Sequence, residues 1–293
     1  MTLSNYLTEP KRSKLANKLR GRKVIEVAEN PMQELKKLVR MHKRWIQTAV
    51  SWEQSVSDRT MHETGEVIEC TLPQTFRDDI KNQAQLLRKE AERLERSMRV
   101  QLQTIPIYKH FLSKIFGVGD VLAAYLVTMI DIRRCVKPSQ LIRYCGNANS
   151  KETGRLERRS AAPRYDPKGE YDPSRGGTYN QELRNRLFLF FRFARMNQRH
   201  GTSKYLERWT EAKEAALKVP GTKPGFADSK GRRKATDLFL EDLYIVWRSL
   251  EGLTVFPDWY SVKRGVGHQG RIIVPEGKVL SLEEALEFVG IQS

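Results

Sequence analysis

Residues suited to a buried helical face recur along the first third of the chain. From Pro31 onward they are spaced by three and four positions: Leu35, Leu38, Val39, His42, Trp45, Ile46 and Ala49. A second pattern alternates four and three without a break: Ile80, Ala84, Leu87, Ala91, Leu94 and Met98. The first pattern predicts an amphipathic helix and the second a coiled-coil seam. The seam requires a partner, either the first helix folded back as a hairpin or the same helix of a second subunit in a homodimer.

A glycine turn follows the seam. Pro106 ends the preceding helix, because proline disfavours helical geometry in the residue before it. Gly117-Val118-Gly119 then separates a short helix, Ile107–Lys114, from the strongly apolar run Val121–Ile130, and Asp120 suits the start of that second helix. The pattern matches a helix-hairpin-helix, in which the glycine amides would bind nucleic-acid backbone without reading its sequence. An ordinary turn between two core helices is the alternative.

Helical patterns continue to the end of the chain. The pattern predicts two helices, over Lys137–Gly146 and Lys204–Lys218. It predicts a last helix over Ser281–Val289, which begins with a capping box. Residues 219–234 are rich in glycine, proline, lysine and arginine, so we expect a linker with a basic end there. The helix predicted over Ala235–Leu250 is apolar over much of its circumference.

The segment from Thr178 to Gln198 predicts the central buried helix of the domain, opened by a capping box at Thr178 and Gln181. Its apolar stripe is wide: Leu183, Leu187, Phe188, Leu189, Phe190, Phe191, Phe193 and Ala194. The remaining face carries a basic stripe: Arg184, Arg192, Arg195 and Arg199. We expect this stripe to bind phosphates, the alternative being helix-end charge complementarity and solubility.

Charge narrows the class of partner. The 293 residues include 52 Lys and Arg against 35 Asp and Glu, a net charge of +17, which favours nucleic acid over a membrane surface. Residues 1–28 form a basic arm suited to lying along phosphates. The longest apolar run is about half of the roughly 20 residues that a spanning helix needs. Because the N-terminus also lacks a signal-peptide core, we expect a cytoplasmic protein without a membrane partner.

The sequence offers little metal or redox chemistry. Cys70, Cys135 and Cys145 lack paired spacing, so we expect free thiols. The histidines are scattered without ligand spacing, and we predict no metal or cofactor in this chain.

An ordered set of motifs surrounds the glycine turn. Ile115–Gly119 and the Leu-Ala-rich helix are followed by Asp131–Arg134, the segment Lys137–Leu141 and the turn Tyr144–Gly146. This order resembles the C-terminal domain of the insertion-sequence transposases typified by the one-ten, one-sixteen and nine-oh-two elements. That family also places a coiled coil directly before the domain. The resemblance covers roughly residues 80–217 and implies DNA binding linked to transposition and recombination.

Two departures bear on catalysis. Family members begin with a ribonuclease-H-like domain whose carboxylates hold divalent metal, and residues 1–74 are too few and too helical to form it. Where the family has a Ser-Gly nucleophile, this chain has Thr153-Gly154, with Ser150 and Ser160 nearby. A hydroxyl needs a base or a metal to become reactive, and none is evident. We expect the chain to lack autonomous nuclease activity.

The loop from Lys151 to Thr178 mixes basic side chains with tyrosines and with acids. Arg155, Arg158 and Arg159 are its candidate nucleic-acid contacts, since guanidinium groups pair with phosphate. The acids in the same loop weaken that assignment.

The predicted protein is therefore mainly α. A basic arm (1–28) precedes a helical hairpin or coiled coil (29–104), a transposase-type helix-hairpin-helix domain (105–217), and a linker with a helical C-terminal extension (218–293). DNA is the expected partner. The alternatives are a recombination subunit that uses a Thr or Ser hydroxyl with a metal domain supplied by another chain, and a scaffold for guide or structured RNA.

Overall fold

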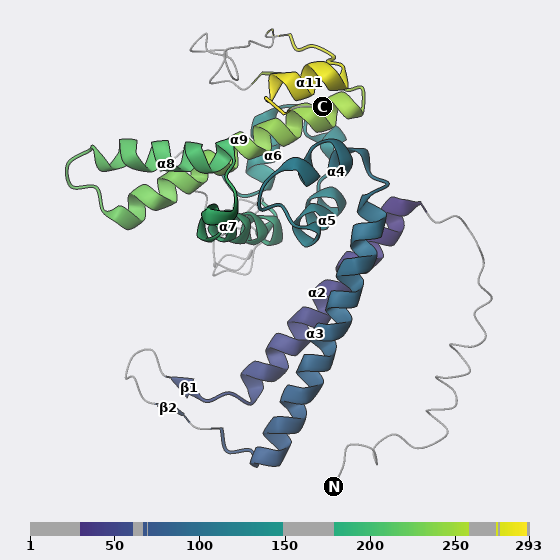
Figure 1. Ribbon diagram of the computed structural model, residues 1–293, viewed down its shortest axis with the longest axis vertical. Coiled ribbons are helices and arrows are strands. Elements are labelled where there is room, and N and C mark those ends of the chain that lie inside the picture. The colour runs from purple at the N-terminus through teal and green to yellow at the C-terminus, as the bar shows by residue number, and fades with distance from the viewer. Residues whose placement is uncertain are drawn as a thin grey trace, which may run out of the picture.

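The computed structural model describes residues 30–60, 67–68, 70–148, 179–257, 274 and 276–291. These residues form a mainly α-helical molecule, which confirms the predicted class. A pair of long helices projects from a body made of the remaining helices (Figure 1). The basic arm expected over residues 1–28 lies outside the described residues.

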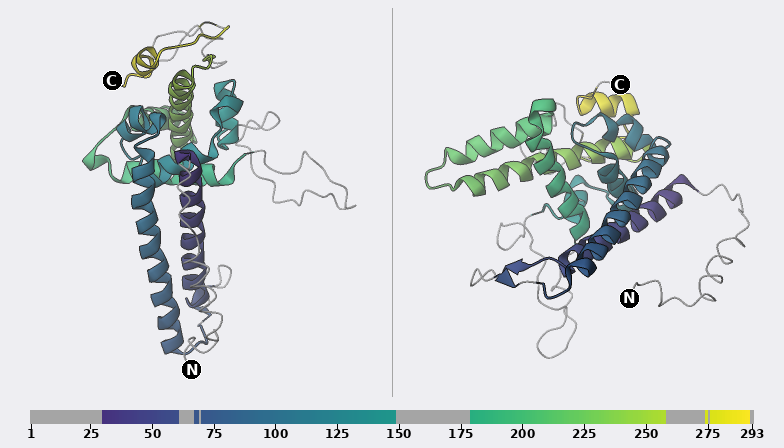
Figure 2. Two further views of the ribbon diagram at one scale, coloured as in Figure 1. Left: turned by 90° about the vertical axis from the view of Figure 1, so that its right-hand side faces the viewer. Right: turned by 60° about the horizontal axis from the view of Figure 1, so that its bottom comes forward.

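The projecting pair consists of α2 (Pro31–Ser55) and α3 (Gln74–Leu102), which run antiparallel and side by side (Figures 1 and 2). The seam predicted on α3 faces α2, with Ala84, Ala91 and Met98 buried. Small side chains at the seam let the two helices approach closely. Within one chain, the partner of the seam is thus the first helix folded back. Two-residue strands, β1 (Arg59–Thr60) and β2 (Val67–Ile68), pair antiparallel beyond the end of α2.

The body begins with the elements around the glycine turn. Their order is α4 (Pro106–His110), η2 (Leu112–Lys114), α5 (Asp120–Met129), η3 (Ile132–Arg134) and α6 (Pro138–Tyr144). The break predicted at Pro106 is present, since α3 ends before it and α4 begins with it. Gly146 adopts a φ of +74° beyond α6, as expected of a residue that ends a helix.

The remaining elements are α7 (Gln181–Met196), η4 (Gln198–His200), α8 (Lys204–Leu217), α9 (Pro224–Leu250) and α11 (Leu282–Phe288). The side chain of Asn180 caps α7 by accepting hydrogen bonds from the amides of Glu182 and Leu183 at 3.1 and 3.2 Å. Asn180 therefore has the capping role expected of Thr178, which lies outside the described residues. The capping box predicted at Ser281 and Glu284 is confirmed.

The prediction of a linker over residues 219–234 is wrong, because α9 begins at Pro224 and continues unbroken through the basic segment. Gly231, a residue that weakened the helical pattern, lies against Trp209 of α8, where an added Cβ would come within 2.5 Å of the indole. Glycine is required there by close helix packing rather than by a turn. Helices α8 and α9 therefore pack against one another on either side of the boundary predicted at residues 217 and 218.

The central buried helix is α9, not α7 as predicted. The ring of Phe239 on α9 lies within 6.3 Å, centroid to centroid, of rings from α7 and α8 and of Phe111. On α7, Phe188, Leu189 and Phe193 are 40%, 54% and 62% exposed. The wide apolar stripe of α7 therefore divides into a buried face and an exposed apolar face.

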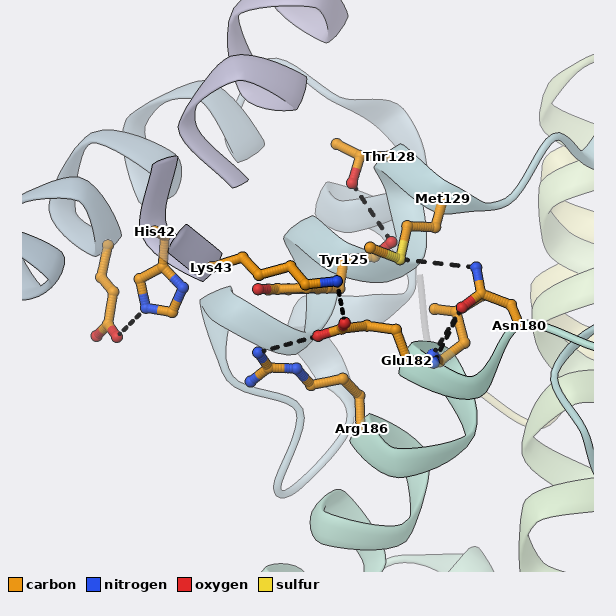
Figure 3. A network of polar contacts seen from close by, with 10 residues as sticks. His42, Lys43, Tyr125, Thr128, Met129, Asn180, Glu182 and Arg186 are labelled. Atoms are coloured by element: carbon orange, nitrogen blue, oxygen red, sulfur yellow. Dashed lines mark hydrogen bonds and ion pairs between the residues drawn. The ribbon is translucent and has the colours of Figure 1, made fainter. Parts of the chain in front are cut away.

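A network of polar contacts joins the projecting pair to the body (Figure 3). Glu182 of α7 forms ion pairs with Lys43 of α2 and, at 3.4 Å, with Arg186. The Arg186 guanidinium lies 4.1 Å from the ring centroid of Tyr125 on α5. Burial raises the pKa of the Tyr125 phenol, and the positive charge of Arg186 opposes that shift. The network connects α2, α5 and α7 at the base of the hairpin.

Candidate nucleic-acid interface

The glycine turn joins η2 to α5, and its two glycines have different roles. Gly117 adopts a φ of +88°, and the amide of Val118 donates to the carbonyl of Ile115 at 3.1 Å to close the turn. Gly119 is the N-cap of α5 in an extended conformation, with a φ of −85°. It is exposed, and an added Cβ would meet no heavy atom of the described residues within 4 Å. Gly119 therefore leaves an accessible backbone surface at the N-terminal end of α5.

The turn is seated on the C-terminal part of α7. A Cβ added to Gly117 would come within 2.8 Å of the Ala194 Cβ and 3.2 Å of the Phe190 ring. The ring of Phe116 packs equally closely against Gly201, just beyond η4. The turn and the arginine-bearing end of α7 were two separate predictions of nucleic-acid contact, and the fold brings them together.

The carboxylate of Asp120 occupies the start of α5 but is engaged with neighbouring side chains. It accepts hydrogen bonds from the Tyr108 hydroxyl and from Arg99 Nε, both at 2.6 Å. Burial and the hydrogen bond to Asp120 raise the pKa of Tyr108 to about 12. The ion pair with Arg99 offsets the negative charge that Asp120 would otherwise present to a phosphate.

The predicted basic stripe on α7 is only partly accessible. Arg192 of α7 and Arg199, which lies beyond the helix in η4, are exposed, and Arg199 Nε donates to His200 at 3.0 Å. Arg195 instead turns inward: its guanidinium lies 4.6 Å from the Trp209 ring centroid and 3.8 Å from Asp228. Arg195 thus holds α7, α8 and α9 together rather than facing solvent with the other two.

Arg184 lies near the opposite end of α7. Its guanidinium lies 5.0 Å from the ring centroid of Tyr179 and donates to that hydroxyl at 2.9 Å. It shares a pocket with Arg232 and Arg233 of α9, which the sequence placed in a linker. The only signal for these two residues was the basic run itself, since their proximity to Arg184 depends on α9 being a helix.

Several predicted site residues lie outside the described residues. These are the candidate hydroxyls Thr153, Ser150 and Ser160 and the loop arginines Arg155, Arg158 and Arg159. Among the described residues, no group of three or more His, Cys, Asp or Glu is arranged to hold a metal ion. Within the same residues, no helix has the combined length and apolarity needed to cross a membrane.

The comparisons with known proteins identify no family. No protein-family model matches the sequence, and no curated protein shows significant similarity to it. The resemblance to insertion-sequence transposases therefore stays a prediction that rests on the order of the motifs around Gly117 and Gly119.

Proposed function

We propose that the protein binds the backbone of nucleic acid, with DNA as the principal partner, through the glycine turn and the C-terminal part of α7. The observation that carries this proposal is the close contact between Gly117 and Ala194. It places the glycine turn, and with it the exposed backbone at Gly119, against the segment of α7 that carries Arg192 and leads into Arg199.

The chemistry of this surface suits phosphate. The first amides of a helix point out of its N-terminal end and carry a partial positive charge, so the start of α5 favours an anion. Because Gly119 has no side chain, a phosphate oxygen could approach the backbone directly. Arg192 and Arg199 would then contact neighbouring phosphates as flexible cations, a mode of binding that positions a strand but does not read bases.

The transposase resemblance gives this binding a biological setting. We propose a role in DNA transposition or recombination in which this chain binds DNA, while cutting and joining depend on a metal-binding carboxylate domain that residues 1–74 do not match. A hydroxyl at Thr153 or a nearby serine could act only with such a domain supplied in trans. Binding of guide or structured RNA by the same surface remains the alternative, since the contacts are to phosphate.

The direct test is Gly119→Val, with Gly225→Val as its matched control. Both glycines have open space around an added Cβ, and neither has a positive φ, so both variants should fold. We expect Gly119→Val to weaken binding to a short DNA duplex by about tenfold, as expected from the loss of a charge-assisted backbone contact. Gly225→Val, at the start of α9, should bind like the wild type. Undiminished affinity in a folded Gly119→Val protein would make the turn a core connector only.

A further inference from the structure

A pocket of about 240 Å³ opens between the end of α6, the start of α7 and the N-terminal half of α9. Three arginines line it, Arg184 from α7 and Arg232 and Arg233 from α9. Amide groups of Asn147 and Asn185 and two hydroxyls add neutral polar groups, and none of the described lining residues is acidic. The lining thus combines three cationic residues with neutral hydrogen-bonding groups.

The wall that follows α6 is held in place by specific contacts. Asn147 Nδ2 donates to the Arg233 carbonyl at 3.0 Å and to Asp237 Oδ1 at 2.6 Å. Gly146 approaches α7 so closely that an added Cβ would lie 2.9 Å from Arg184 Cδ. The amide of Asn180 donates to the Tyr144 carbonyl at 2.7 Å. These contacts fix α6, α7 and α9 relative to one another, so the pocket is formed before any ligand binds.

Two of the guanidinium groups lie against aromatic rings. Arg232 lies 4.0 Å from the ring centroid of Phe188, and Arg184 lies over Tyr179. Contact with an aromatic ring fixes the orientation of a planar guanidinium group and leaves its positive charge unchanged. The exposed ring of Phe188 also lines the pocket, where it offers an apolar surface beside the cations.

The electrostatics favour an anion in this pocket. Burial lowers the pKa of Arg232, the carboxylate of Asp228 opposes that shift, and the nearby charge of Arg184 adds to it. Arg184 and Arg232 therefore repel one another. Asp228 is shared, because it also pairs with Lys213 at 3.0 Å. An anion between the two guanidinium groups would relieve the repulsion and accept hydrogen bonds from both.

We infer that this pocket binds a phosphate group of a nucleotide, with the arginines on the phosphate and Phe188 beside the attached sugar or base. The volume supports a ligand of this size, since it is smaller than the roughly 300–1,000 Å³ of pockets that enclose drug-sized molecules. The inference depends on the proposed function only for the source of the phosphate, which would be a nucleic-acid strand rather than a free nucleotide.

The spacing along α7 connects the pocket to the glycine turn. From Arg184 to Ala194, α7 rises by roughly 15 Å at about 1.5 Å per residue. That rise corresponds to roughly four nucleotide steps at about 3.4 Å per step. One strand lying along α7 could therefore place one phosphate at Gly119 and another in the pocket.

The first arm of the test uses inorganic pyrophosphate and a nucleoside monophosphate, each titrated into the full chain at constant ionic strength by calorimetry. We expect saturable one-to-one binding by the wild type. Arg232→Gln and Arg184→Gln, from opposite walls, should each weaken it by at least about tenfold. Arg96→Gln removes the same charge from an exposed position of α3, outside both proposed binding surfaces, and should leave monophosphate binding unchanged. Circular dichroism and thermal unfolding establish that each variant is folded.

The second arm uses an eight-nucleotide DNA strand. We expect the strand to displace the monophosphate from the wild type, and Arg232→Gln to bind the strand about tenfold more weakly. Absence of saturable binding in the first arm, or equal losses of monophosphate binding in Arg96→Gln and Arg232→Gln, would overturn the proposed site.

The two arms separate the pocket from the proposed function. If the strand does not displace the bound monophosphate, the ligand of the pocket is a free nucleotide. The inference that a nucleic-acid strand supplies the phosphate would then be wrong. If Gly119→Val weakens strand binding and Arg232→Gln does not, the pocket is not a phosphate site for the strand. The proposed function would still stand.

Discussion

Gly117 and Gly119 flank the same valine but have opposite surroundings. Gly117 needs its positive φ and the absence of a Cβ, because α7 lies directly against it, whereas Gly119 needs neither for folding. The sequence indicated a tight turn and could not separate these roles, because the contact with Ala194 comes from a distant part of the chain. Gly117 is a structural residue, and Gly119 is the one that we propose contacts phosphate.

We expect Gly117→Ala to lower the free energy of unfolding by about 2–5 kcal/mol. The left-handed backbone costs about 1–2 kcal/mol with a side chain, and the crowded Cβ adds a cost of overpacking of about 1–3 kcal/mol. Urea denaturation measures the change. Gly119→Ala is the control and should stay within about 0.5 kcal/mol of the wild type. Equal stability of the two variants would mean that the turn does not pack on α7 as described.

A buried carboxylate joins α8 to α9. Asp242 is fully buried, and its Oδ2 accepts from the Tyr205 hydroxyl at 2.7 Å and pairs with Lys204 Nζ at 2.6 Å. Burial, followed by the charge of Asp242, raises the pKa of Tyr205 well above its usual value, so the phenol stays protonated and donates.

Asp242→Ala should destabilise the protein by about 3–5 kcal/mol, because it leaves the Tyr205 hydroxyl and the Lys204 ammonium without the carboxylate that they share. Chemical denaturation provides the measurement. Glu211→Ala, which breaks an exposed pair with Arg208 on α8, should cost less than about 1 kcal/mol. A loss for Asp242→Ala as small as for the control would show that the buried pair does not stabilise the fold.

Among the elements, those with strong local signals were predicted well. Helices α2, α3, α6 and α11 follow from hydrophobic spacing, proline positions and caps, which act over a few residues. The N-terminal half of α9 was missed, because Gly225, Gly231 and the basic run resemble a loop until α8 packs against them. The pocket could not be predicted, since its walls come from three separate segments. The prediction that α7 is the central buried helix was wrong, because an apolar residue gives the same sequence pattern whether its side chain is buried or exposed.

The α2–α3 hairpin also answers part of the coiled-coil prediction. Its seam is already covered by α2, so a homodimer through the coiled coil would have to use another face of these helices. Partly exposed ion pairs flank the seam. Arg88 donates to both carboxylate oxygens of Glu53, at 2.8 and 2.5 Å. The hydrogen bond from Arg88 lowers the pKa of Glu53 below its usual value of 4.5.

A double-mutant cycle with Glu53→Gln and Arg88→Gln should therefore depend on pH. A lowered folded-state pKa means that the pair stabilises the protein above the unfolded-state pKa and loses that contribution as pH falls through the folded-state value. We expect a coupling free energy of about 0.5 kcal/mol at pH 7, because both side chains are partly exposed, and a smaller coupling at pH 3. Urea denaturation at both pH values measures the coupling. Coupling that is unchanged at pH 3 would rule out an ionic origin.

At the scale of the whole molecule, the net charge is +17, and lysines and arginines occur along the whole sequence rather than in one segment. We propose that a specific part of this charge carries the binding, namely the exposed side chains of Arg192 and Arg199. Charge elsewhere, such as on the projecting α3, should contribute to solubility and to weak long-range attraction only. This division distinguishes a defined interface from a general affinity of a basic protein for polyanions.

The most direct test of that claim is the salt dependence of DNA binding. The dissociation constant of a short duplex would be measured over a tenfold range of salt for the wild type and for two double variants. One is Arg192→Gln/Arg199→Gln at the interface. The other is Arg93→Gln/Arg96→Gln on the exposed side of α3, which removes the same charge.

We expect the affinity of the wild type to fall steeply with salt. The slope of log affinity against log salt should become shallower by about 2 in the interface variant, because each phosphate contact contributes a slope of about 0.9, and it should be unchanged in the α3 variant. A wild-type affinity independent of salt, or equal slopes in the two double variants, would contradict the account.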